Sequence, residues 1–160
     1  MIHETAITKS TTDRKLNVIR EFSAPIDKVW KAWTERSILD RWWAPRPWKA
    51  ETKSLDFRAG GTWHYCMVGP KGERQWCLVD FETVDPKRSF RAVSGFCDEQ
   101  GTRNDGIPLM HWFVRFEPSG SGSKILVTIS FDNAGDLEKV VEMGFEQGFT
   151  MGLGNLDEIL

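Results

Sequence analysis

The sequence predicts an α+β fold in which a long C-terminal helix covers a curved antiparallel sheet of seven strands. Residues 135–160 carry apolar side chains at steps of three and four, which is typical of an amphipathic helix. The middle of the chain instead alternates apolar and polar residues in short runs separated by turn residues, which is typical of antiparallel strands. Such a sheet needs a cover for its apolar face, and the C-terminal helix is the only predicted element long enough.

The apolar stripe of the C-terminal helix consists of Leu137, Val140, Val141, Phe145, Phe149, Leu153, Leu156, Ile159 and Leu160. At 1.5 Å per residue the segment would be roughly 37 Å long. Four glycines interrupt it, although each costs about 1 kcal/mol relative to alanine inside a helix; they are Gly144, Gly148, Gly152 and Gly154. They indicate either close backbone packing or room for a bound molecule beneath the helix.

The preceding elements follow one another without a second domain, so we expect residues 14–160 to form a single unit. Residues 1–13 are polar and without periodicity, and predict a flexible tail. A strand is predicted at residues 14–22, and two short helices follow, the first beginning near Pro25 and the second covering residues 38–43. Six further strands are predicted at residues 48–57, 61–68, 73–84, 89–97, 109–117 and 124–131. A polar loop at residues 98–108 lies between the fourth and fifth of these.

Composition excludes several classes of function. The net charge of −2 and the pI near 5.9 leave no basic excess for nucleic-acid binding. The sequence has neither a run of 18 apolar residues nor the apolar core of a signal peptide, so we expect no membrane insertion and a cytoplasmic location. Three cysteines, an odd number, favour reduced thiols over a disulfide framework.

Four segments resemble the START-like (SRPBCC) helix-grip superfamily. They are REFSAPIDKVWKAWTERSILDRWWAP (20–45), DFRAGGTWHYCMVGPKG (56–72), FETVDPKRSF (81–90) and GFEQGFTMGLGNLDEIL (144–160). Within it they are most similar to the family named after the activator of heat-shock-protein ATPase. The resemblance implies a seven-stranded sheet that grips the C-terminal helix, with a cavity that accepts apolar molecules. The eukaryotic cochaperone contacts the chaperone through a separate N-terminal domain, for which the residues before 14 leave no room.

The segment 61–84 contains the residues best suited to metal binding or catalysis. If Gly69 to Gly72 close a tight hairpin, His64 faces Cys77, and Cys66 lies on the same side. One imidazole and two thiols could bind zinc, but their spacing matches no standard zinc motif, so we predict neither a metal nor another cofactor. The opposite face would carry Trp63, Tyr65, Met67, Trp76 and Leu78. Both faces are partly apolar, and the sequence leaves open which one looks inward.

Eight tryptophans and ten phenylalanines can fill a core or form the apolar wall of a cavity. We expect the chain to hold an apolar small molecule or lipid, as a monomer or homodimer, with a possible link to stress responses. The candidate ligand-binding residues are Trp43, Phe57, His64, Cys66, Cys77, Phe96, Trp112, Phe145 and Phe149. One alternative is an enzyme of the cyclase, aromatase or hydrolase type that uses His64 or a cysteine in the cavity. Another alternative is a chaperone-interacting module.

Overall fold

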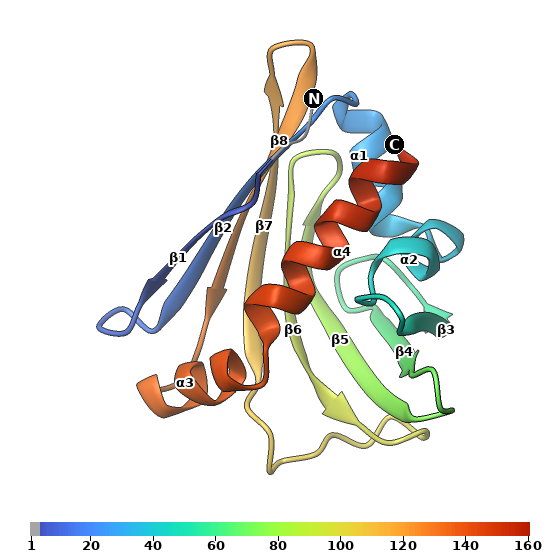
Figure 1. Ribbon diagram of the computed structural model, residues 1–160, viewed down its shortest axis with the longest axis vertical. Coiled ribbons are helices and arrows are strands. Elements are labelled where there is room, and N and C mark those ends of the chain that lie inside the picture. The colour runs from blue at the N-terminus through green and yellow to red at the C-terminus, as the bar shows by residue number, and fades with distance from the viewer. Residues whose placement is uncertain (1–3) are drawn as a thin grey trace.

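The structure, a computed structural model, describes residues 4–160 as an eight-stranded antiparallel sheet with four helices (Figure 1). The strands run in the order β1-β2-β8-β7-β6-β5-β4-β3 across the sheet. Their bounds are β1 Ala6–Ser10, β2 Lys15–Phe22, β3 Lys49–Leu55, β4 Thr62–Val68, β5 Arg74–Asp85, β6 Ser89–Cys97, β7 Met110–Ser119 and β8 Gly122–Ser130. The helices are α1 Ile26–Thr34, α2 Arg36–Trp42, α3 Ala134–Glu142 and α4 Phe145–Ile159. This arrangement confirms the α+β helix-grip prediction.

The core lies between the concave face of the sheet and the helices, with α4 crossing the sheet diagonally (Figure 1). Alternate residues of β2 and β8 point into it, as period-two patterning requires. Leu16, Val18, Ile125, Val127 and Ile129 are each at most 1% exposed. The helices contribute a second apolar layer from Val29, Leu39, Leu137, Leu153 and Leu156. The two layers bury five residues of the apolar stripe predicted for the C-terminal segment and half-bury the other four.

The eighth strand corrects the predicted tail. Ala6–Ser10 pairs with β2 from Ala6 opposite Ile19 to Ser10 opposite Lys15, so it forms an edge of the sheet. Its sequence gave no strand signal because only Ile7 packs against the core, while its neighbours are mostly exposed. Short, polar edge strands are common, since they discourage pairing with other chains. Residues 1–3 of the predicted tail lie outside the described residues.

The single C-terminal helix of the prediction is two helices. The break falls at Met143 and Gly144, where Gly144 adopts a left-handed conformation with φ of 86°. Glycine enters this region without a Cβ clash, which is why it so often ends helices. The apolar spacing conceals the break, because Val141 and Phe145 are four residues apart on either side of it. The turn lets α3 cap one end of the sheet while α4 crosses its concave face (Figure 1).

The polar loop after β6 folds over the convex side of the sheet. Arg103 anchors it through a 2.6 Å ion pair with Asp80 and through hydrogen bonds to the carbonyls of Leu78 and Val93. No helix within residues 4–160 is long and apolar enough to span a membrane.

Candidate functional site

The hairpin of β4 and β5 decides which side chains face the helices. The Gly69 amide donates to the Glu73 carbonyl at 2.8 Å, and Gly72 has φ of 85°, so residues 70–72 form a three-residue loop. This loop pairs Tyr65 with Cys77 and His64 with Leu78. The predicted pairing of His64 with Cys77 is therefore wrong by one residue, and a one-residue shift exchanges the two faces of a strand.

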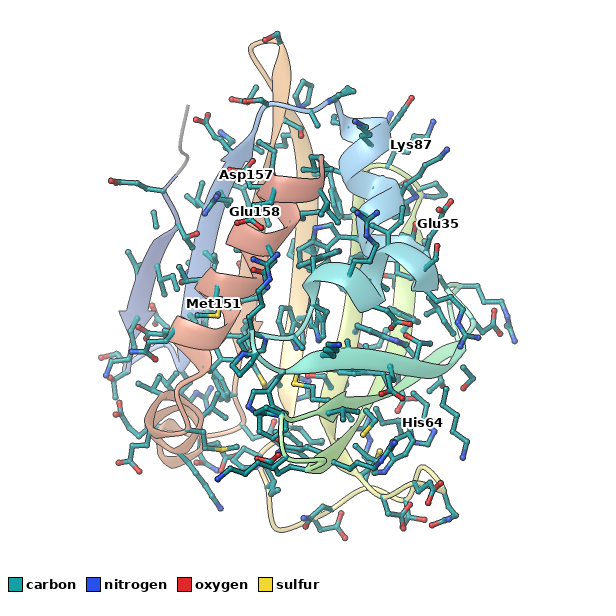
Figure 2. All side chains as sticks on the ribbon, turned by 45° about the vertical axis from the view of Figure 1, so that its right-hand side comes forward. Glu35, His64, Lys87, Met151, Asp157 and Glu158 are labelled. Atoms are coloured by element: carbon teal, nitrogen blue, oxygen red, sulfur yellow. The ribbon has the colours of Figure 1, made fainter. Side chains whose placement is uncertain are left out.

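His64 and Cys66 consequently point to the convex side, away from α4. The His64 ring donates from Nε2 to the Asp98 carbonyl at 3.1 Å and packs 5.0 Å from the Trp76 ring. Figure 2 shows His64 beside the long loop, far from Met151 and Asp157 on α4. Cys66 is fully buried, and burial raises the pKa of its thiol. His64 thus has its partners outside the helix-covered face, and Cys66 is buried on that same outer side.

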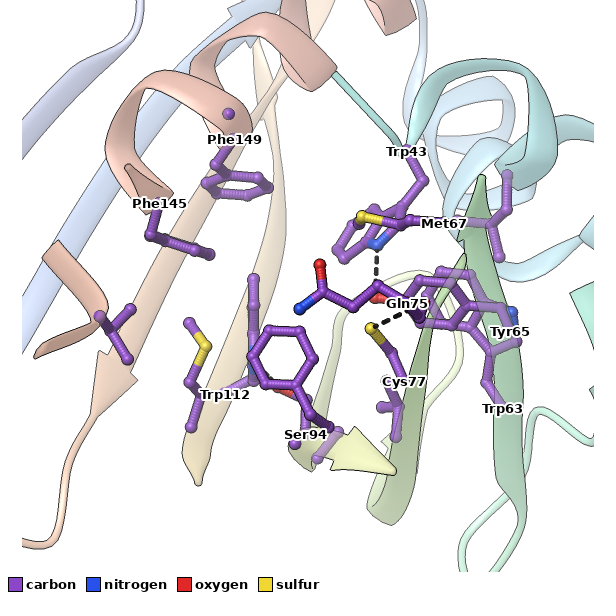
Figure 3. Close-up of a pocket in the computed structure, with 18 of the residues that line it drawn as sticks. Trp43, Trp63, Tyr65, Met67, Gln75, Cys77, Ser94, Trp112, Phe145 and Phe149 are labelled. Atoms are coloured by element: carbon purple, nitrogen blue, oxygen red, sulfur yellow. Dashed lines mark hydrogen bonds between the residues drawn. The ribbon is translucent and has the colours of Figure 1, made fainter. Parts of the chain in front are cut away.

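A cavity of about 250 Å³ lies between α4, the segment after α2 and the concave face of β4 to β7. Its wall contains eleven aromatic residues: Trp33, Trp43, Phe57, Trp63, Tyr65, Phe81, Phe90, Phe96, Trp112, Phe145 and Phe149. Figure 3 shows Phe145 and Phe149 of α4 across the cavity from Trp43, Tyr65 and Cys77. Two lining residues, Gln75 and Met143, are exposed and mark the opening.

The wall carries no side chain that is ionised at neutral pH among the described residues. Asp, Glu, Lys, Arg and His are all missing from the lining. Burial raises the pKa of Cys77 to about 12 and raises the pKa of Tyr65 well above 10.0, so both keep their protons. Within residues 4–160, no three His, Cys, Asp or Glu side chains are grouped closely enough to hold a metal ion.

Most indole nitrogens of the wall donate a hydrogen bond to a hydroxyl group. The Trp43 indole donates to the Tyr65 hydroxyl at 2.8 Å, and the Trp112 indole donates to Ser94 Oγ at 2.8 Å. The Trp63 indole donates to Thr52 Oγ1 at 3.1 Å. These pairs lower the cost of placing indoles around an apolar space, because an unpaired buried donor costs about 1–3 kcal/mol. Trp33 is the exception among the four indoles of the described wall, since its buried Nε1 has no partner.

The glycines of α4 meet different surroundings. A Cβ on Gly148, which lines the cavity, would lie 3.6 Å from Pro45 Cγ, an ordinary contact. A Cβ on Gly152 would lie 3.1 Å from the Trp43 carbonyl oxygen and 3.4 Å from that of Trp42. Of the two interpretations left open by the sequence, room beneath the helix therefore applies at Gly148 and close backbone packing applies at Gly152.

Asn155 fixes the segment against which Gly152 packs. It is 5% exposed, and its Nδ2 donates to the carbonyls of Trp42 at 3.4 Å and Ala44 at 3.2 Å. The Trp42 ring is 1% exposed, and its indole donates to the Ala32 carbonyl. Trp42 thus fills the space between the helices and the sheet, while Trp43 reaches the cavity.

A family model for the Activator of Hsp90 ATPase homolog 1-like proteins (AHSA1) matches residues 23–160. The chain belongs to this family. No curated protein sequence matches it.

Solved structures of similar proteins share the AHSA1-like architecture. Protein Ms6760 from Mycobacterium smegmatis is 26% identical with a TM-score of 0.90, over 98% of this chain and 96% of that one. A protein from Arthrobacter aurescens is 28% identical with a TM-score of 0.90, over 95% and 88% of the two chains. The AHSA1 protein from Silicibacter pomeroyi, 24% identical over 90% and 95% with a TM-score of 0.73, shows the fold alone.

Seven of the nine candidate ligand-binding residues line the cavity of this AHSA1-like domain: Trp43, Phe57, Cys77, Phe96, Trp112, Phe145 and Phe149. His64 and Cys66 do not. The strand register points them to the other face of the sheet.

Sequence reasoning did not nominate Trp63, Tyr65, Met67, Gln75 and Val79, which also line the cavity. The signal that could have found them is the alternation on each strand together with the correct loop length. Once Tyr65 is paired with Cys77, the residues at steps of two on both strands must share their face.

Proposed function

We propose that the chain binds an apolar small molecule in the cavity beneath α4. The observation that carries the proposal is a wall of eleven aromatic residues that has no ionised side chain among the residues described, 4–160. An apolar cavity of about 150 Å³ is large enough to hold benzene, so about 250 Å³ suits a molecule of two fused rings. Burial of such a molecule contributes about 25 cal/mol for each Å² of apolar surface removed from water.

The alternatives drawn from the sequence have less support. The enzyme alternative relied on His64 or a cysteine in the cavity, but His64 faces the other way and the Cys77 thiol stays protonated. A protein-interaction module would have a filled cavity and an exposed aromatic patch. The exposed large apolar residues in the described chain are Ile19, Met143 and Met151, none of them aromatic. The description of the family suggests a chaperone partner. The link to stress responses, the cytoplasmic location and the oligomeric state stay predictions.

Naphthalene is a suitable probe because it is apolar and has two fused rings. Isothermal titration calorimetry should detect its binding to the parent protein. Gly148→Leu places an isobutyl group in the cavity wall and should lower the affinity at least about tenfold, equivalent to about 1.4 kcal/mol.

Gly154→Leu is the matched control on the same helix. A Cβ there meets nothing within 4 Å, and Gly154 does not line the cavity, so naphthalene affinity should stay within about twofold of the parent. If the parent shows no binding, or both variants weaken it equally, the cavity is not the binding site and the proposal fails.

A further inference from the structure

We infer that the ligand is uncharged and has a single polar group that binds the Gln75 amide at the mouth of the cavity. The inference rests on the proposed function and narrows the class of ligand. It follows from the distribution of polar atoms around the cavity, which differs sharply between its interior and its opening.

The interior favours an apolar, uncharged body. Three of the four indoles of the wall already donate a hydrogen bond to a hydroxyl group. These are the indoles of Trp43, Trp63 and Trp112. A ligand polar group placed among them would lose its hydration or displace an existing hydrogen bond, and either change is unfavourable. A carboxylate would be worse, because no cationic side chain among the described lining residues could compensate the loss of hydration.

Gln75 stands where the interior meets solvent. It lies one residue beyond the start of β5, is exposed, and lines the cavity. Figure 3 shows its side chain extending into the cavity from the β4–β5 side. No hydrogen bond joins its side-chain amide to another of residues 4–160.

The amide of Gln75 selects for a particular kind of partner. A primary amide carries both donors and an acceptor without a charge, so it can bind a hydroxyl, a carbonyl or another amide. A ligand with its apolar rings inside and such a group at the mouth keeps its own polar group hydrogen-bonded. Free fatty acids and other carboxylates fit this arrangement poorly.

Three probes of nearly equal shape test the inference by calorimetry at neutral pH: naphthalene, 2-naphthol and 2-naphthoate. The parent should bind 2-naphthol at least about tenfold more tightly than 2-naphthoate. Gln75→Leu introduces an apolar side chain of similar size and removes the hydrogen bond. It should weaken 2-naphthol about fivefold, corresponding to about 1 kcal/mol, and leave naphthalene within about twofold.

A gain of binding provides the sharper test. Gln75→Lys places an ammonium group at the mouth, so it should tighten 2-naphthoate at least about fivefold. Gln147→Lys is the control, because Gln147 is an exposed residue of α4 that does not line the cavity. It should leave naphthoate binding unchanged, which separates a contact at the mouth from a general effect of charge.

Other outcomes would overturn the inference. Trp33 offers an unpaired Nε1 inside the wall. If Trp33→Phe lowers the affinity for 2-naphthol selectively and Gln75→Leu does not, the polar group lies inside and not at the mouth. Equal weakening of all three probes by Gln75→Leu, or tighter binding of 2-naphthoate by the parent, also refutes it. A parent that binds naphthalene but fails these tests leaves the proposed function intact, whereas one that binds no probe refutes both.

Discussion

Replacing Gly152 by alanine should destabilise the fold, whereas the same substitution at Gly148, one turn earlier in α4, should stabilise it. Both changes gain about 1 kcal/mol of helix propensity. At Gly148 this gain stands alone, because the new Cβ makes an ordinary 3.6 Å contact with Pro45. The free energy of unfolding should rise by about 1 kcal/mol, which raises the Tm by about 2–4 °C for a chain of this size.

At Gly152 the new Cβ meets backbone that cannot move freely. It would lie 3.1 Å from the Trp43 carbonyl oxygen, and the carbonyls on either side of Trp43 are held by Asn155. Overpacking of this kind costs typically about 1–3 kcal/mol, which exceeds the propensity gain. The net result should be about 1 kcal/mol of destabilisation, so the two variants should differ by about 2 kcal/mol.

Urea denaturation followed by far-UV circular dichroism measures both variants against the parent. The slope of the unfolding free energy against urea should stay constant, since neither variant changes the surface exposed on unfolding. The reasoning would be refuted if Gly152→Ala were as stabilising as Gly148→Ala. The segment between α2 and β3 would then move to accommodate a methyl group. Its hydrogen bonds with Asn155 would hold it less firmly than their geometry indicates.

Two further predictions concern charge and protonation. Burial raises the pKa of Cys77 from 9.0 to about 12, so the folded protein keeps a proton that the unfolded chain releases. The free energy of unfolding should therefore fall as pH rises from 9.0 towards about 12, and Cys77→Ala should make that fall shallower in urea titrations; an unchanged slope would contradict this. Asp157→Asn should cost about 2 kcal/mol in the same assay, because it removes the negative charge that lies 3.0 Å from the guanidinium of Arg20, which is only 5% exposed. Glu158→Gln, which breaks an exposed pair with Arg46, should cost less than about 1 kcal/mol, and equal losses would argue against a special role for the buried pair.

The sequence predicted the strands that bury one face, because burial imposes a period of two that can be read directly. Strand β8 shows it fully, with Ile125, Val127 and Ile129 buried and their neighbours half-buried. Strand β1 was not predicted because only its Ile7 contacts the core, and a single buried residue shows no period. The helix break at Gly144 was not predicted for a related reason. Its φ of 86° is a property of one residue, whereas periodicity reports the average over several turns.

The site was harder to predict than the fold, because both faces of the β4–β5 hairpin are buried. Cys66, on the convex face, is 0% exposed, while Tyr65 on the cavity face is 5% exposed. Hydrophobicity therefore could not identify the inner face, and the register depended on whether the loop has three or four residues. Outside this hairpin the inward face was easier to recognise, since Phe145, Phe149 and Trp112 belong to elements with one polar face, and all three line the cavity.

The aromatic wall also gives this protein a built-in optical signal. Four of its eight tryptophans line the cavity, as does its single tyrosine, Tyr65. Half of the indoles thus border the space that an incoming molecule would occupy, and indole emission shifts with the polarity of its surroundings. A ligand that absorbs outside the tryptophan excitation band could be followed by intrinsic fluorescence, without labelling or any added dye. Screening of small-molecule collections could therefore begin with the unmodified chain.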